Sequence, residues 1–442
     1  MNLKRWLSLL LSAMLLLGLA YVPAGAAQSP GMNGAAFLAQ LESLGKGAQG
    51  TRLVVKTASG AALPNDFGAQ AKSEGYNAWH VLQYADKTAA DIAYTQLSKQ
   101  RGVVYVERSV RVRMIEPADF YEGPGEQAEP MSWGAPMVQS PQFKQALASQ
   151  AALPETVVAI LDTGLDFTHP YFIENEERIT GRFAGDLSRY AQDDHGHGTH
   201  VAGIICDNAP DNVKISPYKV LDGGGWGEDV YCAVAMCAAA DDGVDVISMS
   251  LRFFSRSKTV DDAVAYATGK GTAVVVAAGN EASDSGEVSP AGAPQAITVA
   301  AVNKDGTPAD FSNYNADIAA PGGYASVNEG INSINSTTPL FTGSYYQRWA
   351  GTSMACPFVS AAAAALKSLH PEYTPADIEF ALKRTARRTQ NWDSIYGTGI
   401  LSCMPLLNLP ELRPSAEKWW ESLSGWVQWV LRCLFFGWIW MK

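Results

Sequence analysis

The sequence TVVAILDTG, residues 156–164, decides the architecture of the chain. It opens with apolar and β-branched residues that do not alternate with polar ones, which predicts a strand buried on both faces. Similar runs, separated by helical stretches, recur at residues 213–220, 244–248, 272–277 and 296–302. Strands that alternate with helices favour a parallel sheet, so we expect a three-layer α/β sandwich with a mostly parallel central sheet.

Polar residues follow two of these strands. Such sheets place their sites at the carboxyl ends of the strands, where Asp162 and Asn280 stand. A carboxylate beside an apolar strand is costly to bury without a partner, and a histidine would supply one. Asp166 is the nearest competitor, but it lies further out in the turn.

A histidine-rich segment, DDHGHGTHVAG at residues 193–203, offers three candidate bases. They are His195, His197 and His200, and the glycines at 196 and 198 allow tight packing where a helix begins. The spacing H-x-H-x-x-H is also compatible with a metal site. We consider a metal less favoured, because a nucleophile motif stands elsewhere in the chain.

That motif is AGTSMACPF at residues 350–358, which contains Ser353. A serine hydroxyl becomes a nucleophile when an imidazole takes its proton and a carboxylate orients the imidazole. The alanine-rich run that follows predicts a buried helix, so the Ser353 N–H at its N-terminus can help to stabilise an oxyanion. The side-chain amide of Asn280 is a second candidate donor.

In these segments, and in the order Asp162, His197 and Ser353, the chain resembles the subtilisin-like serine proteases, or subtilases. The resemblance implies a serine endopeptidase that hydrolyses peptide bonds through an Asp–His–Ser triad and an acyl-enzyme. His197, the first histidine of HGTHVAG, is then the base and Asn280 the oxyanion donor. It also implies that His200 is structural.

The substrate-binding positions follow the family less closely. Ser250, Leu251 and Arg252 resemble the edge strand that pairs with the peptide substrate. The family usually continues with two glycines, whereas this chain has Arg252 and Phe253. In the family these positions line the pocket for the residue before the scissile bond, so the resemblance implies that a cation there favours an acidic or polar residue.

The N-terminal part divides into three segments. Residues 1–26 have a charged start, a short apolar run and small residues, which predicts a signal peptide and a secreted protein. Residues 33–114 predict a small α+β domain, with Ile92 and Leu97 on the inner face of its helix; it resembles the inhibitory propeptide of subtilases. Residues 115–131 are an acidic linker, and we expect the maturation cut between Met114 and Ser132.

The catalytic domain is expected at residues 132–409. Beyond it, residues 410–442 form a tryptophan-rich tail, in which residues 415–442 have an amphipathic pattern. This segment predicts an anchor on the membrane surface, a contact with another protein, or docking on the enzyme itself.

Composition also bears on possible partners, disulfides and cofactors. The net charge of −11 argues against a nucleic-acid partner. The six cysteines are not in metal-ligand spacing and could be buried thiols or disulfides. No cofactor is expected to be required; calcium is possible, but Tyr171 follows His169-Pro170 where many relatives carry an acid, and the stretch 206–217 is short.

Two other functions stay in view. A catalytically silent protein could keep the fold to grip peptides, and intact Asp162, His197, Ser353 and Asn280 argue against it. An esterase of the α/β-hydrolase type would need its serine ahead of the acid and the histidine, so the order in this chain excludes it.

Overall fold

The computed structural model describes thirteen separate parts of the chain. They are residues 37, 40–41, 44, 50–58, 61–73, 76–115, 119–121, 132–150, 153–181, 183–184, 191–324, 333–390 and 392–409. The predicted signal peptide and the tryptophan-rich tail lie outside them. Within these parts, no helix is both long enough and apolar enough to cross a membrane.

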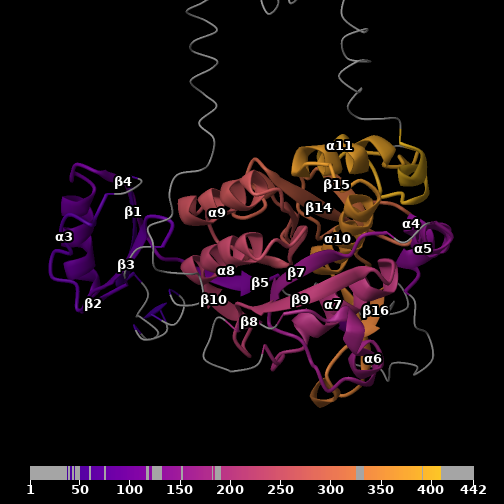
Figure 1. Ribbon diagram of the computed structural model, residues 1–442, viewed down its shortest axis with the longest axis horizontal. Helices are drawn as coiled ribbons and strands as arrows, with labels where there is room; N and C mark the ends of the chain where they lie inside the picture. The colour runs from indigo at the N-terminus through magenta and orange to yellow at the C-terminus, as the bar shows by residue number, and fades with distance from the viewer. Residues whose placement is uncertain are drawn as a thin grey trace, which may run out of the picture.

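A seven-stranded sheet forms the centre of the molecule (Figure 1). Its strand order is β15-β14-β13-β11-β7-β9-β8, and every neighbouring pair is parallel. The predicted strands are confirmed at β7, β9, β11, β13 and β14. The bounds are β7 Thr156–Asp162, β8 Phe183–Ala184, β9 Val213–Lys219, β11 Val246–Met249, β13 Ala273–Ala277, β14 Ala296–Val302 and β15 Ile318–Pro321.

Helices cover both faces of the sheet, which gives the expected three layers. Along β7, Val158 and Ile160 pack into one hydrophobic core, and Ala159 and Leu161 pack into a second core on the opposite face. The first core includes α7 and α10, and the second includes α8 and α9. The strand is therefore apolar from Val157 to Leu161, because both of its faces are buried.

The helices of the larger body, residues 132–409, range from 5 to 18 residues in length within the part of the chain that the structure describes. In chain order they are α4 Gly134–Val138, α5 Ser140–Ala148, α6 Pro170–Glu174, α7 His197–Asn208, α8 Asp229–Asp241, α9 Lys258–Gly269, α10 Thr352–Leu369 and α11 Pro375–Thr385, with short 3₁₀ turns at Glu176–Arg178, Ser285–Glu287, Leu340–Thr342, Ser394–Tyr396 and Met404–Asn408.

The N-terminal unit contains a four-stranded antiparallel sheet and the helix α3. Its order is β2-β3-β1-β4, and α3 packs on one face through Ala90, Ala93 and Leu97. The expectation that Ile92 points inward is wrong, because its side chain is 56% exposed. The buried positions follow the helical repeat of three and four, which leaves residue 92 off their face. The bounds are β1 Arg52–Thr57, β2 Ala71–Lys72, β3 Trp79–Gln83, α3 Lys87–Leu97 and β4 Val103–Arg108.

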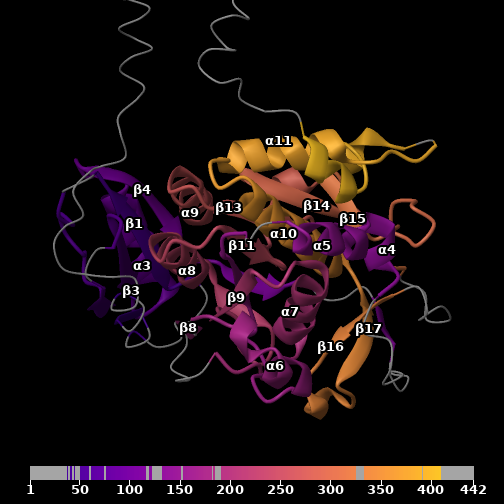
Figure 2. The ribbon, with the colours of Figure 1, turned by 45° about the vertical axis from the view of Figure 1, so that its right-hand side comes forward.

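This unit lies against α8 and α9, as Figures 1 and 2 both show. The sheet face opposite α3 contributes Val54, Trp79 and Val81 to the same hydrophobic core as those two helices. The chain then continues into β5, Arg111–Met114, which lies between β10, Trp226–Glu228, and β12, Leu251–Phe253. The N-terminal part of the chain thus supplies the central strand of a sheet whose two outer strands come from the larger body.

On the side of the body away from this unit, β16, Ile334–Thr337, and β17, Tyr346–Ala350, form an antiparallel hairpin (Figure 2). A third strand, β6, Asp119–Tyr121, pairs with the other edge of β17. The five cysteines within the described residues are all buried free thiols, at positions 206, 232, 237, 356 and 403.

Candidate active site

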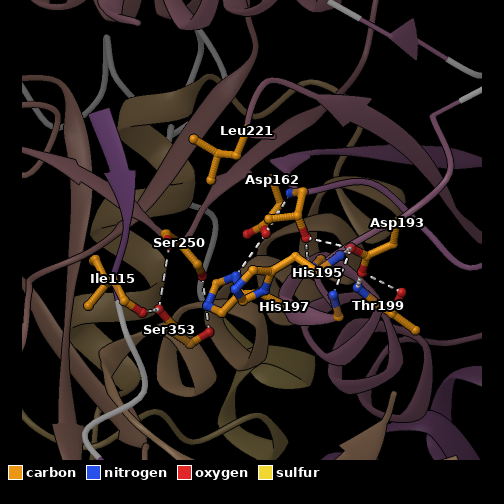
Figure 3. A network of polar contacts seen from close by, with 12 residues as sticks. Ile115, Asp162, Asp193, His195, His197, Thr199, Leu221, Ser250 and Ser353 are labelled. Atoms are coloured by element: carbon orange, nitrogen blue, oxygen red, sulfur yellow. Dashed lines mark hydrogen bonds and ion pairs between the residues drawn. The ribbon is translucent and has the colours of Figure 1, made fainter. Parts of the chain in front are cut away.

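Asp162 and His197 meet where β7 ends and α7 begins (Figure 3). Oδ1 of Asp162 lies 2.7 Å from Nδ1 of His197, and both side chains are fully buried. Gly198 makes this approach possible, because a Cβ there would lie 2.2 Å from the carbonyl oxygen of Gly164. The carboxylate therefore orients the imidazole and fixes which ring nitrogen faces away from it.

The other candidate acid, Asp166, forms hydrogen bonds within its own turn. Its carboxylate accepts hydrogen bonds from the Thr168 N–H and hydroxyl and from the Gln192 amide. Asp166 therefore stabilises the local loop, whereas Asp162 contacts His197.

A second buried carboxylate, Asp193, was not predicted from the sequence. It accepts hydrogen bonds from the Thr163 and Thr199 hydroxyls and from the main-chain N–H groups of His195, Gly196 and Thr199. Burial opposes its ionisation, but these hydrogen bonds dominate and lower the pKa of Asp193. The ionised side chain ties the turn after β7 to the start of α7, where His197 lies.

The other two histidines differ from His197 in their surroundings. His200 is fully buried, its Nε2 lies 3.1 Å from the carbonyl oxygen of Gln347, and its ring stacks on Trp349. Burial lowers the pKa of His200 to about 3, so it is neutral and structural, as expected. Burial also lowers the pKa of His195, which is partly exposed.

Ser353 lies in the first turn of α10, and its side chain is fully buried. Its hydroxyl donates to the carbonyl oxygen of Ile115 at 3.0 Å (Figure 3). Among the described residues, Nε2 of His197 has no hydrogen-bond partner. The serine thus points at the main-chain carbonyl that follows β5, and the imidazole nitrogen that would take its proton is unoccupied.

Asn280 is oriented by the residue before the serine. Its Oδ1 accepts hydrogen bonds from both the N–H and the hydroxyl of Thr352, each at 2.9 Å. The Thr352 hydroxyl in turn accepts from the N–H of Gly279. The oxygen end of the amide is thus fixed on Thr352, and the NH₂ end is the hydrogen-bond donor of this side chain.

The predicted substrate strand, β12, pairs with β5 of the same chain. The Ile115 N–H donates to the carbonyl oxygen of Ser250, and the Met114 N–H donates to that of Gly225. On β12, Leu251 lies opposite Met114 and Arg252 opposite Arg113. Gly225 is required for this approach, because a Cβ there would lie 2.9 Å from the Met114 side chain, and its φ is +73°.

The side chain of Arg252 forms an ion pair with Glu281, with a guanidinium nitrogen 3.0 Å from a carboxylate oxygen. It also lies over the ring of Phe254. Glu281 directly follows Asn280, so the ion pair joins β12 to the loop that carries Asn280. The sequence alone suggested that Arg252 is an isolated cation, and Glu281 neutralises it.

The described residues contain no cluster of three or more His, Cys, Asp or Glu that could hold a metal ion. The short stretch after α7 is instead in contact with the buried cationic side chain of Arg178. The guanidinium of Arg178 donates to the carbonyls of Cys206, Pro210 and Val213. The expectations about cofactors and calcium remain predictions.

Comparison with known proteins agrees with this geometry. The sequence model of the subtilase family matches residues 154–399. Subtilisin E of Bacillus subtilis (strain 168) is 33% identical over 339 residues, which cover 73% of this chain and 80% of the relative. Subtilisin Savinase of Lederbergia lenta is 35% identical over 286 residues, which cover 62% of this chain and 98% of the relative. The chain therefore belongs to the subtilase family and is a subtilisin-like serine endopeptidase.

Proposed function

We propose that this chain is a secreted endopeptidase made as a self-inhibited zymogen, with Asp162, His197 and Ser353 as its triad. One observation carries the proposal. The carbonyl oxygen of Ile115, a residue of the chain's own N-terminal part, lies 3.0 Å from the Ser353 hydroxyl. A peptide bond of the chain itself therefore occupies the place of a substrate.

The chemistry follows from the bonded groups. Ser353 transfers its proton to Nε2 of His197 and attacks the carbonyl carbon, and Asp162 stabilises the imidazolium through Nδ1. The amide of Asn280 and the Ser353 N–H hold the oxyanion, and losing one such donor costs about 10²–10³ in turnover. His197 then protonates the leaving amine, and water hydrolyses the acyl-enzyme by the reverse sequence.

The first bond cut is the one between Ile115 and Glu116. This bond lies inside the interval of residues 114–132 expected from the sequence. The residues that precede it indicate the substrate class: Val112, Met114 and Ile115 are buried, which favours apolar side chains at those positions. The guanidinium groups of Arg111 and Arg113 lie 4.5 and 4.8 Å from the ring centroid of Trp226, so a cation is accommodated there.

Inhibition by the N-terminal unit is supported by its contacts with the two helices. The carboxylate of Glu107 accepts hydrogen bonds from the N–H groups of Lys258 and Thr259, at the start of α9. The hydroxyl of Ser109 donates to Asp229, the first residue of α8, at 2.6 Å. A carboxylate at a helix N-terminus is favourable, so these contacts hold the unit in place while β5 fills the substrate site.

Secretion rests on the sequence of residues 1–26, and a role for residues 415–442 at a membrane surface or on a partner protein rests on their amphipathic pattern. Both segments lie outside the described residues. Flotation with vesicles of the full chain, against a chain that ends at Leu409, tests the second role.

Mass spectrometry of the purified chain and of the Ser353→Ala variant after incubation tests the proposal. We expect the wild type to release a fragment that ends at Ile115 and the variant to stay intact. A wild type that also stays intact, and is not labelled by a fluorophosphonate at Ser353, would instead be the silent peptide-binding protein. Cleavage of both chains at the same bond would point to a contaminating protease.

A further inference from the structure

The central strand of the sheet β10-β5-β12 has one buried face and one face open to solvent. On β5, Val112 and Met114 are buried, whereas Arg111 is exposed and Arg113 is partly exposed. Residues two apart on a strand share a face, so the two arginines lie together on the open face. Counted back from the proposed scissile bond after Ile115, they are the fifth and the third residues.

An aromatic side chain of β10 contacts both arginines. Trp226 lies directly opposite Arg113 in the register of the two strands, so it lies on the same open face. The guanidinium groups of Arg111 and Arg113 lie 4.5 and 4.8 Å from the centroid of its ring. Phe254, which directly follows β12 on the other side of β5, stacks on this ring with the centroids 6.1 Å apart. The two rings therefore meet over the open face of β5, where the face of the indole attracts a cation.

A carboxylate of β10 stands beside the position of the fifth residue. Glu228 lies directly opposite Arg111. In this structure its carboxylate accepts hydrogen bonds from the guanidinium of Arg52, at 2.5 Å, and from the hydroxyl of Ser109, at 3.4 Å. Both donors belong to the N-terminal part of the chain and leave with it when the N-terminal unit departs after cleavage. The Glu228 carboxylate then faces the place of Arg111 without these two donors.

A cation also stands on the other neighbouring strand, but it is neutralised. Arg252 lies opposite Arg113 in the pairing of β12 with β5. Its guanidinium is 3.0 Å from the carboxylate of Glu281 and lies over the ring of Phe254. Repulsion by Arg252 therefore does not cancel the attraction that Trp226 exerts on a cation at the third position.

We infer that Trp226 and Glu228 make the processed enzyme select polypeptides with basic side chains at the third and fifth positions before the scissile bond. The inference rests on the proposed function, because it takes the bond after Ile115 as the one cut and requires the N-terminal unit to depart. The indole attracts a cation at either position, and Glu228 adds an ion pair at the fifth. The chain's own segment, with Arg111 and Arg113, is the first substrate of this class.

Synthetic peptides with the sequence of residues 110–119 test the selection on the enzyme that self-cleavage releases. Citrulline, which has the shape of arginine without its charge, replaces the arginine at the third position, at the fifth, or at both. We expect kcat/KM to fall about 2- to 5-fold for the third position, the effect of one cation–π contact, and about 3- to 10-fold for the fifth. Mass spectrometry checks that every peptide is cut at the same bond. Equal kcat/KM values for all four peptides would overturn the inference and leave the proposed function standing.

Variants of the two residues assign the effect to them. In Trp226→Leu the ratio of kcat/KM for arginine over citrulline should fall to about 1 at the third position, and Trp226→Phe should keep part of it. Glu228→Gln should lower the ratio at the fifth position and leave the third unchanged. A ratio measured within one enzyme is insensitive to a general loss of activity, so damage to the fold does not imitate these results. Unchanged ratios in Trp226→Leu or, if that variant does not fold, in Trp226→Phe would exclude the role of the indole.

Helix α11 offers matched controls outside this sheet. Phe380 is an exposed ring with the guanidinium of Arg384 5.9 Å from its centroid, and Glu379 forms an ion pair with Lys383. Phe380→Leu and Glu379→Gln therefore remove the same kinds of group. Both variants should keep the wild-type ratios at the third and fifth positions, and a change in either would show that the ratios do not report on β10.

A double-mutant cycle in the Ser353→Ala chain gives a readout that does not need catalysis. Urea unfolding of this chain with Arg113→Gln, with Trp226→Leu and with both changes measures how strongly the two side chains interact. We expect a coupling of about 2- to 5-fold in the unfolding equilibrium constant. The absence of coupling would contradict the attraction between the indole and the cation. If the wild type cleaves no peptide, the proposed function fails and the selection with it, and the cycle still decides whether Trp226 attracts Arg113.

Discussion

At the scale of single residues, Arg252 shows how a partner changes the meaning of a charge. A lone cation beside the substrate strand predicts attraction of an acidic side chain, but the guanidinium lies 3.0 Å from the carboxylate of Glu281. Both side chains are partly exposed, so the pair contributes little to stability. Its effect is on specificity, because the net charge presented to the substrate is close to zero.

This pairing predicts that Arg252→Gly does not abolish a preference for acidic residues, since there is none to lose. In the processed enzyme, the ratio of kcat/KM for matched peptides with Glu or Phe before the scissile bond should change by less than about 3-fold. Glu281→Gln leaves the cation without its carboxylate and should shift the ratio toward Glu by about 5-fold, the effect of about 1 kcal/mol. A shift toward Phe in Glu281→Gln would contradict this account.

The histidine that contacts Asp162 could be predicted from the sequence, but the hydrogen bonds that Asp193 forms beside it could not. The motif HGTHVAG predicts His197 as the base, and the structure places its Nδ1 2.7 Å from Oδ1 of Asp162. Asp193 offered no comparable signal, because its hydrogen bonds come from Thr163 and from the residues that follow it. Only the folded turn brings these donors around one carboxylate.

At the scale of elements, the stretch after α7 is held by a side chain from another part of the fold. Arg178 is 3% exposed and satisfies the carbonyls at the end of α7 and at the start of β9. A cation surrounded by main-chain oxygens is also what a bound calcium ion provides. The guanidinium contacts the main-chain oxygens of this loop, and we predict that the loop folds without a bound metal ion.

We predict that Arg178→Met lowers the free energy of unfolding by about 3 kcal/mol, because several buried carbonyls lose their donors. Urea unfolding of the Ser353→Ala chain, with and without Arg178→Met, measures this loss. Arg178→Lys keeps the charge without the planar fork and should recover part of it. Addition of EDTA should leave the unfolding curve of the Ser353→Ala chain unchanged, and a large destabilisation by EDTA would overturn the role assigned to Arg178.

The long elements were predictable, and the short pairing strands were not. The runs that became β7 and β14 are mostly apolar and do not alternate with polar residues, so their burial on both faces could be inferred from local sequence alone. Strands β5, β6 and β10 have three or four residues each and no such pattern. They are strands only because distant segments lie beside them.

At the scale of the whole molecule, the contact between the N-terminal unit and the catalytic body contains a buried acidic residue, Asp229. Asp229 is fully buried and accepts hydrogen bonds from Ser109 of the unit and Ser257 of the body. Burial raises the pKa of Asp229 to about 7; the hydrogen bond from Ser109 opposes this rise, and the nearby carboxylate of Glu107 adds to it. Burial in this contact therefore favours the protonated form of the Asp229 carboxyl group.

The sign of the resulting pH dependence follows from linkage. A carboxyl group whose pKa rises from 3.8 to about 7 on folding contributes stability that is fully present below about pH 4 and is lost as the pH rises to about 7. We predict that the melting temperature of the Ser353→Ala chain falls over this interval. Asp229→Asn, which cannot ionise, should show a smaller fall, and an equal fall in both chains would refute the assignment to Asp229.

The sequence by itself determined the parallel α/β body, its long strands, and the residue types and order of the catalytic segments. These depend on periodicity and on short motifs, which act over a few neighbouring residues. The tertiary structure alone decided which carbonyl faces Ser353, which carboxylate neutralises Arg252 and which strand covers β17. The Ser353–Ile115 contact joins residues 238 positions apart. No local pattern specifies such a partner, because it is selected by the packing of the N-terminal unit on α8 and α9 as a whole.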